Sequence, residues 1–189
     1  MNGDVVRQVL DFWFGPEDAP GRGRFRKQWF AVSPAFDAEI ASRFLTVWEE
    51  AAAGGLDHLA DTPNGSLALV LILDQFPRNM FRGTPRAFAT DARAYAVADT
   101  AVARGFDRQV LPVQRIFLYL PFEHSESLAD QERCVTLMTA LGDDMAIDYA
   151  VRHRDIIARF GRFPHRNAIL GRPSTAEETA FLAQPGSSF

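Results

Sequence analysis

Apolar residues recur at helical spacing along most of the chain, and this feature limits the possible folds more than any other. In residues 5–13 and again in residues 36–48, apolar side chains fall at positions i, i+3 and i+4, as on the buried face of a helix. No segment alternates apolar and polar residues with the period of two that is typical of a half-buried strand. The sequence therefore predicts an all-α protein.

Helix start and stop signals divide this pattern into short helices. Ser33-Pro34 combines a capping residue with a proline at the first helical position, and Gly54-Gly55 ends the helix that follows. Similar signals predict roughly eight to ten helices with short connections, which makes neighbouring helices antiparallel pairs. A length of 189 residues with 47% hydrophobic content predicts one helical domain over 1–189, with a frayed tail at 184–189.

Composition argues against several classes of function. A net charge of −4 is unsuited to neutralising many phosphates, so we expect no nucleic-acid partner. The longest uninterrupted apolar run, Leu67 to Leu73, is too short to span a membrane. Asp4, Arg7 and Asp11 interrupt the apolar residues at the N-terminus, which is unlike a signal peptide. We expect a cytoplasmic protein without a membrane partner; its oligomeric state is open.

One phrase occurs twice, as Gln75-Phe76-Pro77-Arg78-Asn79 and as Arg162-Phe163-Pro164-His165-Arg166-Asn167. A proline after an apolar helical run is expected to end that helix, and the Arg and Asn that follow carry several hydrogen-bond donors. We predict a ligand-binding role for six residues of these segments: Arg78, Asn79, Arg82, His165, Arg166 and Asn167. In the alternative interpretation, these side chains only cap the orphan carbonyl groups of the preceding helix.

Glu123-His124 is the best candidate for acid–base catalysis, because an imidazole beside a carboxylate can exchange protons near neutral pH. The pair follows Pro121 in a predicted turn between helices. Alternatively, Glu123 only favours the positive N-terminus of the helix that begins after Ser127. His153 lies on an apolar helical face and is interpreted as a hydrogen-bonded core histidine.

Other kinds of site find little support in the sequence. Cys134, the single cysteine, lies in an apolar helical stretch and is interpreted as a buried, inert thiol. No His-x-x-x-His pair occurs, and neither does a Walker or Gly-x-Gly-x-x-Gly loop. We therefore predict no metal site and no cofactor.

The quoted segments resemble a bacterial family of unknown function, DUF924. The resemblance extends over about residues 3–183, from Val-Leu-Asp-Phe-Trp-Phe-Gly at 9–15 to Leu170-Gly171-Arg172. It implies an all-helical, tetratricopeptide-like fold with right-handed pairs of helices, and it implies no established activity.

Three functions are consistent with these features. The first is binding of a small anionic or polar ligand by the predicted Arg, His, Glu and Asn residues, with hydrolytic or proton-transfer activity if the protein is an enzyme. The second is a tetratricopeptide-like scaffold that binds a peptide or helix of a partner protein. In the third, the polar residues are structural clamps at helix ends and bind no ligand.

Overall fold

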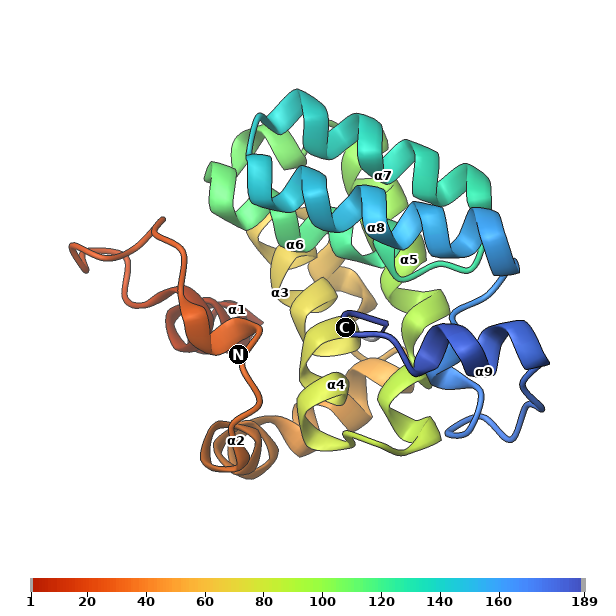
Figure 1. The fold of residues 1–189 in the computed structure, drawn as a ribbon. Helices are drawn as coiled ribbons and strands as arrows, with labels where there is room; N and C mark the ends of the chain where they lie inside the picture. The colour runs from red at the N-terminus through yellow and green to blue at the C-terminus, as the bar shows by residue number, and fades with distance from the viewer. Residues whose placement is uncertain (1, 188–189) are drawn as a thin grey trace. The chain divides into compact units, whose positions relative to one another are not determined.

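The structure, a computed structural model, describes residues 2–187, and the regular elements in that range are helices joined by loops (Figure 1). No strand occurs in that range, which confirms the predicted fold class. The α-helices are α1 (Asn2–Phe14), α2 (Pro34–Ala52), α3 (Pro63–Val70), α4 (Phe76–Met80), α5 (Asp91–Ala103), α6 (Pro112–Glu123), α7 (Leu128–Leu141), α8 (Asp144–Phe160) and α9 (Ala176–Leu182). Short 3-10 helices are η1 (Lys27–Trp29), η2 (Asp57–Asp61), η4 (Pro85–Phe88), η5 (Asp107–Gln109) and η6 (Pro164–Arg166), and η3 (Leu71–Gln75) is a π-helix.

The chain divides into two compact units. The first unit contains residues 1–82 and 86–121, and the second contains residues 83–85 and 122–189. The boundary falls inside α6, whose last two residues, Phe122 and Glu123, belong to the second unit. The single helical domain and the tetratricopeptide-like arrangement stay predictions.

Aromatic side chains form much of the core of the first unit. Trp13 of α1 is fully buried and stacks on Trp29, with ring centroids 6.3 Å apart. Phe117 of α6 meets both indole rings edge-on, and Phe76 contacts Trp13 from α4. Edge-to-face and offset arrangements suit the charge distribution of aromatic rings. The apolar face of residues 5–13 therefore packs into a core that η1, α4 and α6 complete.

The second unit is built on the hairpin of α7 and α8, which run side by side in opposite directions (Figure 1). Gly142 ends α7 with a φ of 79°, a conformation that glycine adopts without steric cost, and the Asp143 side chain then caps α8. The N-cap of α7 is Ser127, as expected from the sequence. After α8, Phe163 packs in a small apolar cluster with Ile156 and Ile157.

Neither Pro77 nor Pro121 ends a helix, and this corrects the expectation from the sequence. Pro121 lies inside α6, so Glu123 is the last residue of that helix instead of part of a turn. Before Pro77, the helix widens into the π-turn η3, in which the Phe76 N–H bonds to the Leu71 carbonyl five residues earlier. The widened turn accommodates the proline, and the chain continues directly into α4.

Side-chain caps also begin α3 and α9. Thr62 is the N-cap of α3, with Pro63 in the first turn. In α9, Thr175 and Glu178 form a capping box. Within the predicted tail, the Ser187 hydroxyl donates to the Leu182 carbonyl, and residues 188–189 lie outside the described residues. No helix among the described residues is long and apolar enough to cross a membrane.

Candidate functional site

In the first unit, Arg78 is bonded to acidic side chains of the protein itself. Its two terminal nitrogens contact both carboxylate oxygens of Asp91 at 2.8 and 3.0 Å, and one of them also lies 3.1 Å from Asp74. Asp74 is completely buried, and its backbone carbonyl accepts a further bond from Arg78. The two carboxylates raise the pKa of Arg78 even though burial opposes the charged form.

Asn79 and Arg82 share a single partner, Asp37 of α2. The Asn79 amide donates to Asp37 at 2.7 Å, and Arg82 donates to both carboxylate oxygens at 3.1 Å. These bonds fasten α4 to α2. The three predicted residues of the first unit are thus engaged by internal carboxylates, which favours the clamp interpretation for them.

In the second unit, Glu123 lies beside a residue that the sequence analysis placed in the core. Glu123 and His153 are 4% and 5% exposed, and Glu123 Oε1 lies 3.5 Å from His153 Nδ1. The same Nδ1 lies 2.8 Å from the Tyr149 carbonyl oxygen. A carbonyl can only accept, so Nδ1 carries the proton and Nε2 is the acceptor nitrogen. The Glu123 carboxylate therefore has a buried imidazole as its neighbour.

Three predicted residues gather around this buried pair. The ring centroids of His124 and His153 are 6.5 Å apart, and Phe163 lies 5.6 Å from His153 and 5.5 Å from His165. The Arg166 guanidinium stacks 4.4 Å above the Phe163 ring and donates to the His124 carbonyl at 3.1 Å. We name the group His124, His153, His165 and Arg166 the cationic cluster.

Electrostatics within the cationic cluster disfavour a further positive charge. Burial lowers the pKa of His153 to about 3, and the nearby His124, His165 and Arg166 act in the same direction. His153 is therefore neutral at physiological pH.

Asn167 is bonded to side chains of the segment that follows η6. It is fully buried, its amide donates to Ser174 Oγ, and its Oδ1 accepts from Arg172 Nε at 3.0 Å. Arg172 also contacts both carboxylate oxygens of Glu126, which accepts from the Phe163 N–H. Burial opposes the charge on Glu126, but these partners outweigh it and lower the pKa of Glu126. The network fixes the segment after α8, and with it His165 and Arg166.

Gln131 of α7 holds the turn that carries His124. Its buried amide nitrogen donates to the backbone carbonyls of Glu123 and Ser125 at 2.6 and 2.7 Å. These carbonyls lie at the end of α6 and just after it, where a helix has no donors of its own. Sequence spacing gave no signal for Gln131, because its role depends on how α7 packs.

Cys134 is buried, as predicted, and its Sγ lies 3.9 Å from Glu123 Oε2. Burial, with a contribution from Glu123, raises the pKa of the Cys134 thiol far above its usual range. Among the described residues, no group of three or more His, Cys, Asp and Glu side chains is arranged to hold a metal ion.

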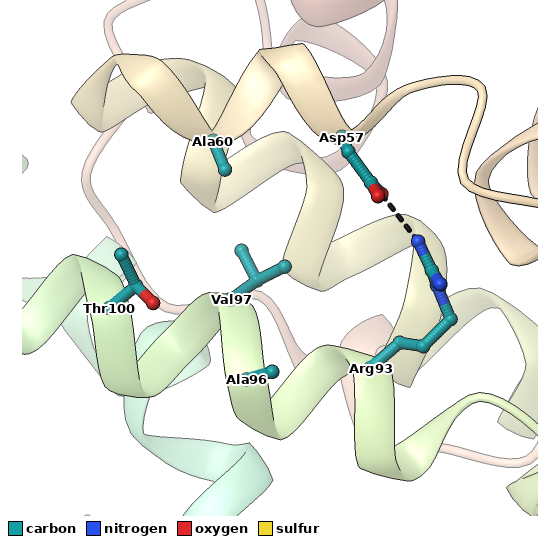
Figure 2. A pocket seen from close by; sticks show the side chains of 6 residues that line it. All are labelled: Asp57, Ala60, Arg93, Ala96, Val97 and Thr100. Atoms are coloured by element: carbon teal, nitrogen blue, oxygen red, sulfur yellow. Dashed lines mark hydrogen bonds and ion pairs between the residues drawn. The ribbon is translucent and has the colours of Figure 1, made fainter.

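A groove in the first unit contains none of the predicted site residues (Figure 2). It lies between η2 and α5, and Asp57 and Arg93 form an ion pair at one end. Ala60, Val97 and Thr100 supply small side chains along the rest. The groove thus offers a ligand little beyond an ion pair that is already formed.

The fold and these contacts define an all-helical protein with internal Arg–carboxylate clamps and a buried Glu–His pair. The chain belongs to the family described as "Bacterial protein of unknown function (DUF924)", whose model matches residues 9–186. It is similar to a solved protein of unknown function from Agrobacterium tumefaciens, with 42% identity and a TM-score of 0.88 over 97% of this chain and 99% of that one. No curated protein matches the chain.

Proposed function

We propose that the protein binds a small anionic ligand at the cationic cluster of the second unit. The observation that carries the proposal is the convergence of His124, His165 and Arg166 on one buried, neutral histidine. The Arg166 guanidinium carries a permanent positive charge, and the imidazoles of His124 and His165 are groups that can be protonated. A bound anion would offset the positive charge at this place. Carboxylates and phosphates are the anions that such donors recognise best.

Hydrogen bonds from neighbouring residues hold the backbone around the cationic cluster, which favours a rigid site. Gln131 fixes the backbone on either side of His124, and the Glu126–Arg172 pair fixes Phe163. Side chains held by such bonds lose little further entropy when a ligand arrives, which improves affinity. The His165 and Arg166 side chains extend from a short 3-10 helix that starts at Pro164, where the backbone is also constrained.

Within this proposal, Glu123 and His124 are the candidates for proton transfer. Glu123 is buried beside His153, so a proton added to or removed from the carboxylate is exchanged away from bulk water. The reaction that would use this proton is open. Arg78, Asn79 and Arg82 take no part in the proposed site, because their partners are Asp37, Asp74 and Asp91.

Histidine NMR tests the proposal directly, because the chain has only four histidines. Inorganic phosphate or citrate is added at constant ionic strength, with chloride as the reference anion. We expect the imidazole signals of His124 and His165 to move with saturation. The signal of His58, which is exposed on η2, should stay in place and is an internal control.

Matched variants separate this site from general attraction of anions. Arg166→Ala should abolish the saturable shift of the His124 and His165 signals. Arg152→Ala should leave that shift intact, because Arg152 is an exposed residue of α8 paired with Asp148. If phosphate and citrate leave His124 and His165 unaffected, or move His58 equally, the proposal is wrong and the clamp interpretation holds.

A further inference from the structure

A stack of aromatic rings leads from the core of the first unit to its surface. Phe117 is fully buried, and Phe30 stacks on it at a centroid distance of 6.2 Å with the rings 6° from parallel. Phe25 stacks on Phe30 in turn, at 5.9 Å and 14°. Phe25 and Phe30 are nevertheless 47% and 56% exposed. The core thus holds two large apolar rings in a fixed position at the surface.

Two exposed aliphatic residues lie near these rings, one in the chain and one against the loop that carries Phe25. Val32 follows Phe30 by two residues and is exposed, and Leu111 lies against the backbone at Gly23, close to Phe25 in the chain. We name Phe25, Phe30, Val32 and Leu111 the aromatic patch. Among the described residues of the first unit, every large apolar residue that is exposed belongs to it. Large apolar side chains gathered in one place, rather than scattered singly, are typical of an interaction site.

Basic residues beside the patch fall into two classes. Arg22 donates to Asp11 and to the Gly15 carbonyl, and Arg26 donates to the carbonyls of Trp13 and Phe14. These two arginines anchor the loop to the end of α1. Arg24 and Lys27, on either side of Phe25, are exposed and form no ion pair among the described residues. Arg24 and Lys27 thus place two positive charges close to Phe25 in the chain, whereas the exposed acidic residues of the loop, Glu17 and Asp18, lie seven or more residues before Phe25.

The same charges argue for a protein partner and against a membrane. Recognition of anionic lipids takes clusters of about four to eight Lys and Arg residues. Here two of the four basic residues are bonded internally, and the two that remain, Arg24 and Lys27, are fewer than such recognition takes. A partner segment with a few acidic side chains can instead meet Arg24 and Lys27 individually.

We propose that the aromatic patch is a docking surface for an acidic segment of a partner protein, which places large apolar side chains on Phe25 and Phe30. The apolar contacts supply most of the affinity, and Arg24 and Lys27 supply the preference for acidic sequences. This surface is independent of the cationic cluster in the second unit.

Two designed peptides test the proposal. Both are amphipathic helices with Leu and Phe on one face; the other face carries Glu in one peptide and Lys in the second. Fluorescence anisotropy of the labelled Glu peptide should show binding that weakens with added salt and is at least about tenfold tighter than that of the Lys peptide.

Variants of the full chain complete the test. Phe30→Ala, Phe25→Ala and Lys27→Glu should each weaken binding of the Glu peptide about tenfold. Tyr149→Ala, at an exposed aromatic of the second unit, should not change it. Lys27→Glu removes no buried contact, so its effect is readable even if a Phe variant folds poorly. Equal binding of both peptides, or none, would overturn the proposal. It would also be overturned by Phe30-dependent binding to phosphatidylserine vesicles or Phe30-dependent dimerisation in sedimentation.

Discussion

Thr90 donates its hydroxyl proton to the Leu73 carbonyl oxygen at 2.5 Å. Leu73 lies four residues before Pro77, which has no N–H to offer. Trp48 in turn donates its indole N–H to the Thr90 hydroxyl at 3.2 Å. A residue at the start of α5 thus supplies the bond that Pro77 removes, and this is one reason why the chain stays helical through the Phe-Pro step.

We expect Thr90→Val to destabilise the protein by about 2 kcal/mol, because it leaves the buried Leu73 carbonyl and the Trp48 N–H without partners. Thr90→Ser retains the hydroxyl and is the matched control. Urea unfolding of both variants measures the difference. Equal stabilities for Thr90→Val and wild type would show that water satisfies the carbonyl instead.

Arg78 and Arg82 should differ sharply in their contribution to stability. Arg78→Ala removes a charged partner of the fully buried Asp74 and leaves the amide of Gln75 to bond its other oxygen, which we expect to cost about 3 kcal/mol or more. Arg82→Ala breaks a pair whose arginine side chain is 44% exposed, and should cost about 1 kcal/mol or less. Thermal and urea unfolding compare the two. A near-neutral Arg78→Ala would instead favour a binding role for this residue.

His153 should make the protein less stable in acid. Its pKa falls from 6.5 to about 3 on folding, so between these values the unfolded chain binds one more proton than the folded one. The contribution of His153 to the free energy of unfolding is therefore present above pH 6.5 and is lost as the pH falls toward 3. Over this range the free energy of unfolding falls by up to about 1.4 kcal/mol per pH unit.

Urea unfolding at several pH values measures this slope. His153→Gln cannot be protonated in that range and should flatten the dependence. His58→Gln, at an exposed position, should keep the wild-type slope. The same slope in His153→Gln and wild type would assign the acid sensitivity to other groups.

Arg172 should control the order of the segment after α8. Arg172→Ala removes the partner of Glu126 and a donor to Asn167, so we expect the Phe163 amide to exchange its hydrogen faster, since that amide bonds to Glu126. Arg159→Ala breaks an exposed pair with Glu177 and is the control. Unchanged exchange at Phe163 in Arg172→Ala would show that packing alone orders the segment.

Several features of the protein were determined by local sequence. The helical period and the caps at Ser33 and Ser127 depend on residues within one or two turns of each other, and the structure has them as predicted. The burial of His153 and Cys134 likewise follows from their positions on apolar helical faces. Such interactions can be predicted because sequence spacing fixes which side chains share a face.

The tertiary structure alone decided how Pro77 is accommodated and which partners the polar residues have. Thr90 reaches Leu73, and Asp37 reaches Arg82, only because separate helices pack together. The Phe-Pro-Arg-Asn and Phe-Pro-His-Arg-Asn segments look alike in sequence. Yet Arg78 is paired with carboxylates, whereas Arg166 stacks on Phe163 among histidines. Long side chains find partners across elements far apart in the chain, and no local spacing encodes that choice.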